Sequence, residues 1–332
     1  MSVTTRPAVL LATAAFAAGL LTAPAPAWAA DTTTPMTAAQ MRSALRAVGA
    51  ASQQAGAGGW RGVTDFRMTS DGTTVTIKDT VTVDPVQGRF GEVTSVSGYG
   101  TESTYAAAGR GAWIQTGSIE VKALKMMGRP EVKYMFDADR NLKLDEFVRK
   151  SAFDTASLIE YYSLPGTRTV HDDGSIDYKV TENEQKSTIV VHTTAASVLT
   201  GMEMTSTGAN ATIGFTYAAQ TVELPAAAVT LDIATVNKGV AYLGMTGTVK
   251  TTAQQGAAST RKAAKGRTVK VTTLRKLVRK EATAANRFSG TTLVKINDIS
   301  GGVRVHATNP WTKQTVAYSV KASGRKVVVK KL

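Results

Sequence analysis

Histidine is the side chain best suited to acid–base and metal chemistry near neutral pH, and this chain has 3 histidines: His171, His192 and His306. They lie far apart in the sequence, and none forms a motif with a nucleophile or a second metal ligand. His171 falls in an acidic turn, and the other two occupy alternating positions of expected strands. We therefore expect structural or solvated histidines, no catalytic residue and no metal site.

Other reactive groups are missing or poorly arranged. The chain has no cysteine, which excludes disulfides, zinc–thiolate sites, iron–sulfur clusters and thiol catalysis. It also has no serine-nucleophile elbow, phosphate-binding loop, dinucleotide glycine fingerprint or zinc-protease motif. The carboxylates of Asp145-Glu146 and Asp172-Asp173 are adjacent and expected at the surface. No cofactor is expected, although a hydrolase using two distant carboxylates stays open.

One acidic segment imitates the start of a calcium loop. Residues 137–145 place oxygen-bearing side chains at loop positions 1, 3, 5 and 9. However, Leu142 stands where the sharp turn needs glycine, and Val148 stands where a bidentate carboxylate is needed. This segment is therefore expected to be a solvated turn and a helix start.

Charge divides the 332-residue chain, whose formal net charge is +14. Residues 1–233 carry 19 lysines and arginines against 23 acidic residues, whereas residues 234–332 carry 20 against only Glu281 and Asp298. Such asymmetry indicates different partners for the two parts. Hydrophobic content of 43% excludes a wholly disordered chain.

The first residues resemble an export signal. Arg6 precedes an apolar run over 8–21, prolines follow, and Ala27-Trp28-Ala29 matches a cleavage site. The run is too short to cross a bilayer core of roughly 30 Å, which disfavours the alternative of a membrane anchor. We expect a signal peptide over 1–30, a mature protein beginning at Ala30 or Asp31, secretion to the cell envelope, and no transmembrane segment after cleavage.

Residues 31–233 read mainly as strands. A helix begins after a capping box formed by Thr37 and Gln40, and alternation over 73–84 predicts a half-buried strand after an Asp71-Gly72 turn. Further strands are expected at 93–99, 103–108, 111–116, 176–181, 187–193, 199–206, 211–217 and 220–224. A helical and loop insertion over 122–164 separates the two groups. This order predicts an α+β fold with a curved antiparallel half-barrel and covering helices.

The same region resembles bacterial lipoprotein carriers and the LppX/LprG-type lipid-binding envelope lipoproteins, over about residues 37–230. The likeness is carried by element order, by Gly111-Ala112-Trp113-Ile114 as a strand, and by Ile213-Gly214-Phe215 and Val222-Glu223-Leu224-Pro225 as the closing segments. It implies a non-enzymatic protein that holds acyl chains in an apolar hollow between sheet and helices. Without cysteine, this chain has no covalent lipid anchor.

Flexible apolar side chains in the insertion suit such a hollow. The candidate ligand-binding residues are Trp113, Met126, Met127, Met135, Phe136, Leu158, Ile159 and Tyr162, the last three on a short helix that Asp154 can cap. The alternative is that these side chains are plain core under a loop.

The remainder is expected to contain a helical, Ala-rich linker over 234–265 and a basic α+β domain over 266–332. A helix begun by Asp232 is expected over 231–249, and Thr251–Gly266 is expected to be a linker or a solvated helix extension. A better helix over 273–285 should pack on one face of an antiparallel sheet, leaving the other face positive. Trp311 is either a lid on the core or an exposed anchor.

The candidate polyanion-binding residues are Arg275, Lys276, Arg279, Lys280, Lys326 and Lys330. The expected partner is an anionic cell-wall polymer or membrane surface, and nucleic acid is the less favoured alternative. We thus expect an exported envelope protein that binds a lipid or acyl chain. A ligand-free structural or adhesion protein, or less readily a secreted hydrolase, remains the alternative.

Overall fold

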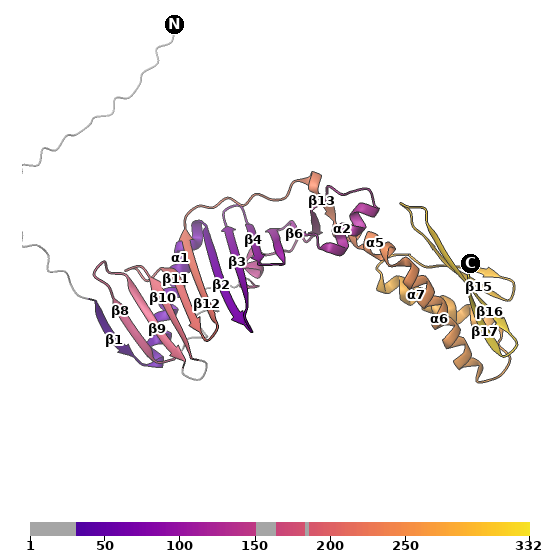
Figure 1. The fold of residues 1–332 in the computed structure, drawn as a ribbon. Coiled ribbons are helices and arrows are strands. Elements are labelled where there is room, and N and C mark those ends of the chain that lie inside the picture. Colours follow the sequence, from indigo (N-terminus) through magenta and orange to yellow (C-terminus); the bar gives the residue numbers. More distant parts are fainter. Residues whose placement is uncertain (1–30, 151–163, 183–185) are drawn as a thin grey trace, which may run out of the picture.

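The computed structural model describes residues 31–150, 164–182 and 186–332. A large curved sheet occupies one end of the molecule, and a small sheet with two long helices occupies the other (Figure 1). The fold class predicted from the sequence is confirmed: α+β, with a curved, unclosed antiparallel half-barrel followed by a small helix-plus-sheet unit. Within the described ranges, no helix combines the length and apolar character that a bilayer crossing needs.

The large sheet has 13 strands in the order β1-β8-β9-β10-β11-β12-β2-β3-β4-β5-β6-β7-β13. Their bounds are β1 (Thr32–Met36), β2 (Trp60–Ser70), β3 (Thr73–Asp84), β4 (Arg89–Val96), β5 (Gly100–Ala107), β6 (Gly111–Gln115), β7 (Tyr134–Ala138), β8 (Gly166–Val170), β9 (Ile176–Glu182), β10 (Ser187–Thr193), β11 (Leu199–Ser206), β12 (Ala209–Tyr217) and β13 (Thr230–Asp232). All neighbours pair antiparallel except β13 and β7, which pair in parallel. The pairing of β12 with β2 joins the later strands to the earlier ones.

Among the described residues, the helices that accompany this sheet before the second unit begins are α1 (Ala38–Ala55), α2 (Ser118–Met126) and α3 (Leu144–Lys150). Short 3₁₀ turns lie at Gly56–Gly58 and Ala227–Val229. The second unit consists of α5 (Ile233–Leu243), α6 (Met245–Ala264), α7 (Val271–Phe288), β14 (Lys295–Ile299), β15 (Gly302–Thr308), β16 (Thr315–Ser323) and β17 (Lys326–Lys331).

Local sequence signals explain several of these elements. The Thr37 hydroxyl accepts a hydrogen bond from the Gln40 amide at 3.3 Å, and the Gln40 side chain accepts one from the Thr37 amide at 2.8 Å, so the predicted capping box is confirmed. At the predicted hairpin turn, Asp71 and Gly72 have φ of 49° and 75°. Two successive left-handed residues match the twist of the flanking strands β2 and β3.

The strand predicted over 220–224 is wrong, because this segment pairs with none of the described strands and instead passes β4, where Val222 approaches Gly91. Val222 is 4% exposed, and its carbonyl accepts a hydrogen bond from the Arg89 guanidinium at 3.1 Å. An extended segment lying on a sheet face buries alternate side chains as a strand does, which explains the misleading pattern. The predicted insertion contains α2, β7 and α3, and its residues 151–163 lie outside the described ranges.

In the second unit, α7 and the antiparallel sheet β14-β15-β16-β17 form as predicted. The helix predicted over 231–249 instead ends as α5 and restarts as α6 at Gly244, although Asp232 does cap α5. Helix α6 then buries Val249, Ala253 and Ala257 against α7 and the small sheet. The Ala-rich stretch predicted as a linker or solvated extension therefore contributes to a hydrophobic core.

Trp311 lies over this core rather than in solvent. Its half-buried ring meets Tyr242 of α5 edge-on, with 5.6 Å between the ring centroids. Of the two alternatives that the sequence left open, the structure favours the lid.

Candidate functional site

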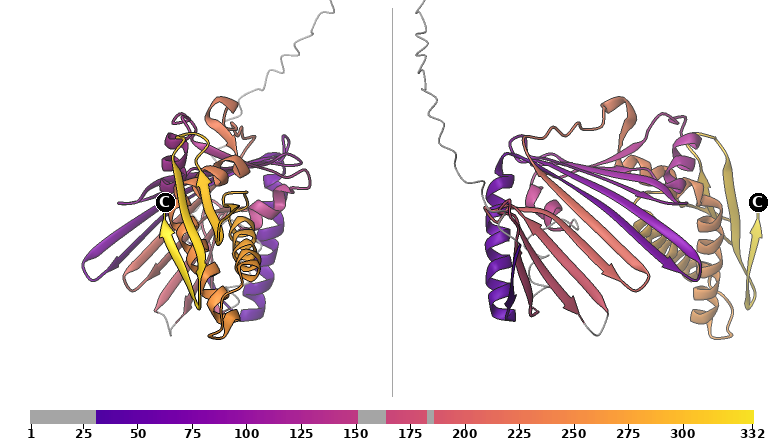
Figure 2. Two further views of the ribbon diagram at one scale, coloured as in Figure 1. Left: turned by 90° about the vertical axis from the view of Figure 1, so that its right-hand side faces the viewer. Right: turned by 60° about the vertical axis from the view of Figure 1, so that its left-hand side comes forward.

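Helices α1 and α3 cover the same face of the large sheet, which we call the inner face. Along α1, Met41, Leu45 and Val48 pack on the inner-face residues of β9–β11. Helix α1 stands at that end of the sheet (Figure 2). Helix α3 packs Phe147 against Phe90 of β4, with ring centroids 5.6 Å apart. Apolar residues alternate with polar ones along each strand, which is why one face can bury against helices.

Between the two helix-covered areas, β12 and β2 present a row of half-buried apolar side chains. This central strip consists of Trp60, Phe66, Ile213, Phe215 and Tyr217, which the strand register places on the inner face. Ile213 and Phe215 touch both helix-covered cores. The Phe215 ring lies 6.3 Å from those of Trp60 and Tyr217. Partly exposed aromatic and aliphatic surface is the feature that an apolar ligand needs.

The central strip was not among the ligand-binding sites predicted from the sequence. Its signal was nonetheless present, because Ala211, Ile213, Phe215 and Tyr217 occupy alternate positions of a strand that was predicted. What could not be deduced was that helices would leave this strand half-covered while burying its neighbours.

A carboxyl pair borders the central strip on the inner face. Burial raises the pKa of Asp79, which is 9% exposed and accepts a hydrogen bond from the Thr94 hydroxyl at 2.9 Å. Burial also raises the pKa of Glu92, and the neighbouring charge of Asp79, to which it hydrogen bonds, raises it further. These groups supply the inner face with titratable hydrogen-bonding positions beside its apolar surface.

Two of the predicted ligand-binding residues lie on the opposite, outer face. Trp113 of β6 and Phe136 of β7 are paired in register, with ring centroids 4.6 Å apart, and the Arg110 guanidinium lies 5.5 Å from the Trp113 ring centroid. Ala112, one residue earlier, packs on the inner face. Because strand side chains alternate, the one-residue offset separates Trp113 and Phe136 from the central strip.

The predicted methionines lie at the junction of the two units. Met126 packs against the core of the second unit, and its sulfur accepts a hydrogen bond from the Asn309 amide at 3.0 Å. Met127 approaches Gly239 of α5 so closely that a Cβ there would collide with its sulfur. Met135 packs with Leu124, Val132 and Val236. These contacts favour the alternative of plain core, and Leu158, Ile159 and Tyr162 lie outside the described residues.

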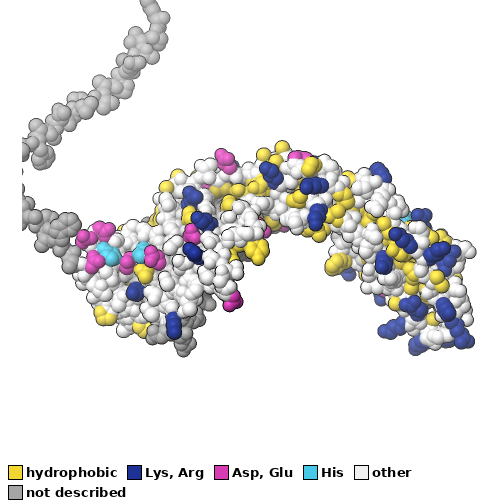
Figure 3. Space-filling view, in the orientation of Figure 1, with side chains coloured by type: hydrophobic (Ala, Val, Ile, Leu, Met, Phe, Trp, Pro, Cys, Tyr) yellow, Lys and Arg dark blue, Asp and Glu magenta, His cyan; other side chains and the backbone are white. Residues whose placement is uncertain are grey.

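The predicted polyanion-binding cations divide into bound and free groups. Arg275 donates to the carbonyls of Ile299 and Gly302 at 3.1 and 3.3 Å, and Arg279 pairs with Asp298 at 2.7 Å. These two arginines therefore hold α7 to β14 and β15. The side chains of Lys276, Lys280, Lys326 and Lys330 are exposed. Lysine and arginine side chains spread over the second unit (Figure 3).

Two histidines join a carboxylate network on the outer face, at the other end of the molecule (Figure 3). Asp177 contacts His192 at 2.8 Å and His171 at 3.1 Å, and His171 also contacts Asp31 at 3.0 Å. Hydrogen bonds to Asp177 and Asp31 raise the pKa of His171. The network ties β1, β8, β9 and β10 together, as expected for structural histidines. Among the described residues, no cluster could hold a metal ion.

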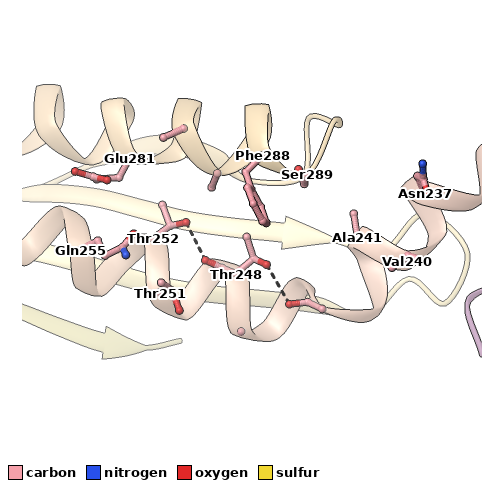
Figure 4. A pocket seen from close by; sticks show the side chains of 14 residues that line it. Asn237, Val240, Ala241, Thr248, Thr251, Thr252, Gln255, Glu281, Phe288 and Ser289 are labelled. Atoms are coloured by element: carbon pink, nitrogen blue, oxygen red, sulfur yellow. Dashed lines mark hydrogen bonds between the residues drawn. The ribbon is translucent and has the colours of Figure 1, made fainter. Parts of the chain in front are cut away.

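An apolar groove of about 790 Å³ runs between α5, α6 and α7. Small residues such as Gly244, Gly247 and Ala284 line it, and the ring of Phe288 projects from α7 toward Thr248 of α6 (Figure 4). Phe288 is 96% exposed. The groove offers a second apolar surface, separate from the central strip.

Comparisons with known proteins gave matches among solved structures alone. No family model matches the chain, and no curated protein matches it. Similar solved structures include the lipoprotein LppX of Mycobacterium tuberculosis, at 8% identity and a TM-score of 0.29 over 55% of this chain and 98% of that one. They also include LprF of Mycobacterium bovis, at 10% identity and a TM-score of 0.31 over 58% of this chain and 98% of that one. LppX is a member of the group that the sequence resembles.

Proposed function

We propose that this chain is an exported cell-envelope protein whose half-barrel binds a lipid or acyl chain on its inner face, while its basic unit attaches to an anionic surface. The observation that carries the ligand proposal is the central strip. Its aromatic and aliphatic side chains are half-buried between two helix-covered cores, and Ile213 and Phe215 contact both. In this proposal the protein is a carrier and not an enzyme.

The energetics of an acyl chain support this site. Each buried methylene contributes roughly 0.8 kcal/mol, so ten methylenes contribute roughly 8 kcal/mol before the cost of association. A row of apolar side chains along β12 extends over several residues, which matches the elongated shape of such a ligand. The nearby carboxyl groups of Asp79 and Glu92 offer hydrogen bonds to a polar headgroup.

The site is tested with a fluorescent fatty acid and two matched phenylalanine variants. Phe215→Gln places a polar amide in the central strip, and Phe288→Gln makes the same change in the groove between α5 and α7. We expect the first to weaken binding by about tenfold, as the burial of a large apolar side chain predicts, and the second to leave it unchanged. If Phe215→Gln lowers the melting temperature, Phe66→Gln at the other end of the strip replaces it as the test of the central strip.

Native mass spectrometry of protein purified from its own host provides the independent test. A co-purified lipid supports the carrier. A bare mass together with no fatty-acid binding would favour the structural or adhesion protein, and turnover of an ester panel would favour a hydrolase. Loss of binding in Phe288→Gln alone would show that the ligand binds in the groove between α5 and α7.

Export and attachment are tested separately. The mature amino terminus should be Ala30 or Asp31 if residues 1–30 are removed as a signal peptide. The full mature chain should be retained on purified cell wall, with retention falling as salt rises, because exposed charges are screened. Retention that does not depend on salt would contradict an electrostatic attachment.

A further inference from the structure

The small sheet has one face turned away from α6 and α7, and basic side chains dominate it. The strand register places Lys295, Arg304, His306, Lys321, Lys326 and Lys330 on this basic face. The opposite face carries Val303, Val305 and Val320, which pack in the core with the helices. The sequence predicted that this face of the sheet would be positive, and Lys326 and Lys330 of this face were among the candidate polyanion-binding residues.

The basic face has no acidic counterpart within the described part of the chain. The second unit has two acidic residues, and both belong to the helix side. Glu281 of α7 accepts a hydrogen bond from Ser259 at 3.0 Å, and Asp298 pairs with the arginines of α7. The described structure gives Lys321 and Lys330 no ion pair, and both side chains are exposed. Cations with no internal partner are the ones available to an anionic ligand.

Arg304 and His306 lie at the centre of this face. Among the described residues, the Nε atom of Arg304 and the Nε2 atom of His306 are buried and have no hydrogen-bond partner. Burial lowers the pKa of His306, and the charges of Arg304 and Lys295 lower it further. On the two strands that pair with β15, His306 faces Lys295 of β14 and Ala317 of β16, so neither facing residue is a carboxylate that would oppose this lowering of the pKa. A bound anion would raise the pKa of His306, because it favours the charged imidazole.

The geometry points to a linear phosphodiester polymer of the cell wall as the partner of the basic face, with His306 making its binding tighter at acidic pH. The inference rests on the proposed attachment role and names its surface and partner. Each of the four strands contributes at least one basic side chain to this face: Lys295 from β14, Arg304 and His306 from β15, Lys321 from β16, and Lys326 and Lys330 from β17. Because neighbouring strands lie about 4.8 Å apart, an extended polyanion crossing the strands meets a basic side chain on every one of them. Arginine and lysine are suited to phosphate oxygens.

Two other polyanions fit the basic face less well. Single-stranded nucleic acid needs exposed aromatic rings for base stacking, but Tyr318 packs toward the helices and Trp311 packs on Tyr242. A bilayer favours an apolar anchor next to the cations. The most exposed aromatic ring of the second unit, Phe288, belongs to the helix side and not to the basic face.

The test measures binding of the mature chain to poly(glycerol phosphate) at roughly 0.15 M salt. Lys321→Gln/Lys330→Gln removes two charges from the basic face, and Lys276→Gln/Lys280→Gln removes two from α7. All four side chains are exposed, so both variants should keep the wild-type melting temperature. We expect the first pair to weaken binding roughly tenfold and the second less than about twofold.

A pH series tests the histidine. Wild-type affinity should rise from about pH 7.5 to about pH 5.5, and His306→Gln should flatten this rise. An equal rise in the variant would overturn the role of His306.

The remaining outcomes separate this inference from the proposed function. An equal or larger loss in the α7 pair would overturn the basic face as the site. Tighter binding of a dT20 oligonucleotide than of the polymer would identify nucleic acid as the partner, and binding to anionic vesicles alone would identify a membrane. If the wild-type chain retains no polyanion at all, the proposed attachment role itself fails.

Discussion

Replacing Gly256 by alanine should expose how closely α6 and α7 cross. A Cβ at Gly256 would lie 2.8 Å from Cγ2 of Val278 and 3.1 Å from its Cα. The second distance involves backbone, which cannot move away without shifting α7. Gly247 lies in the same helix, and a Cβ there would meet no heavy atom within 4 Å. The two glycines thus form a matched pair.

The magnitudes follow from two opposing effects. Alanine is favoured over glycine in a helix interior by about 1 kcal/mol, which applies in full at Gly256 and is the upper limit at Gly247, the third residue of α6. Overpacking of a core costs about 1–3 kcal/mol, and this cost applies at Gly256 alone. Gly247→Ala should therefore stabilise the second unit by up to about 1 kcal/mol, and Gly256→Ala should leave it unchanged or destabilise it by up to about 2 kcal/mol.

Native-state hydrogen exchange of the α6 and α7 amides measures the effect within the unit concerned, without assuming that the whole chain unfolds in one step. The free energy of opening should differ between the two variants by about 1–3 kcal/mol. Equal changes in both variants would refute the close crossing, and so would a more stable Gly256→Ala protein.

Three further changes follow from the charged groups. Asp79→Asn should raise the melting temperature at neutral pH, and this gain should vanish near pH 4. The reason is that the pKa of Asp79 is raised in the folded protein, so the wild-type protein loses stability as the pH rises through that pKa. A gain that does not depend on pH would contradict this. His171→Asn should accelerate the hydrogen exchange of the β1 amides, most strongly below about pH 6.5. The raised pKa of His171 means that this histidine stabilises the fold at low pH, and that the stabilisation is lost as the pH rises through that pKa. An acceleration that grows toward alkaline pH would be the wrong sign. Asp298→Asn should cost less than about 1 kcal/mol in urea unfolding, with a smaller cost at high salt, because its ion pairs are exposed; a cost that salt leaves unchanged would show that screening is not involved.

Much of the fold follows from short-range sequence patterns. The alternation over 73–84 coincides with β3, and the capping box at Thr37 begins α1, because both signals act between residues a few positions apart. The segment 220–224 shows where this reasoning stops. Its alternation reflects contact with a sheet face, and whether an extended segment finds a strand partner depends on residues far away in the chain.

The location of the candidate site depended on which sheet face each side chain occupies and on which areas the helices cover, and less on residue type. Trp113 and Phe136 are large and apolar, as a ligand site requires, yet the register of β6 with β7 places them opposite the helices. The central strip lies between the areas that α1 and the described part of α3 cover, and no local sequence pattern records that placement. Residue types therefore indicated an apolar ligand more readily than they indicated its contact residues.

The sequence by itself determined the concentration of positive charge in the last hundred residues and the absence of thiol chemistry, since both are properties of composition. Only the tertiary structure decided which cations remain available. It brings Asp298 to Arg275 and Arg279 and leaves Lys321 and Lys330 unpaired among the described residues. Charge is carried by each residue alone, whereas its neutralisation requires a second residue that folding brings within a few ångströms.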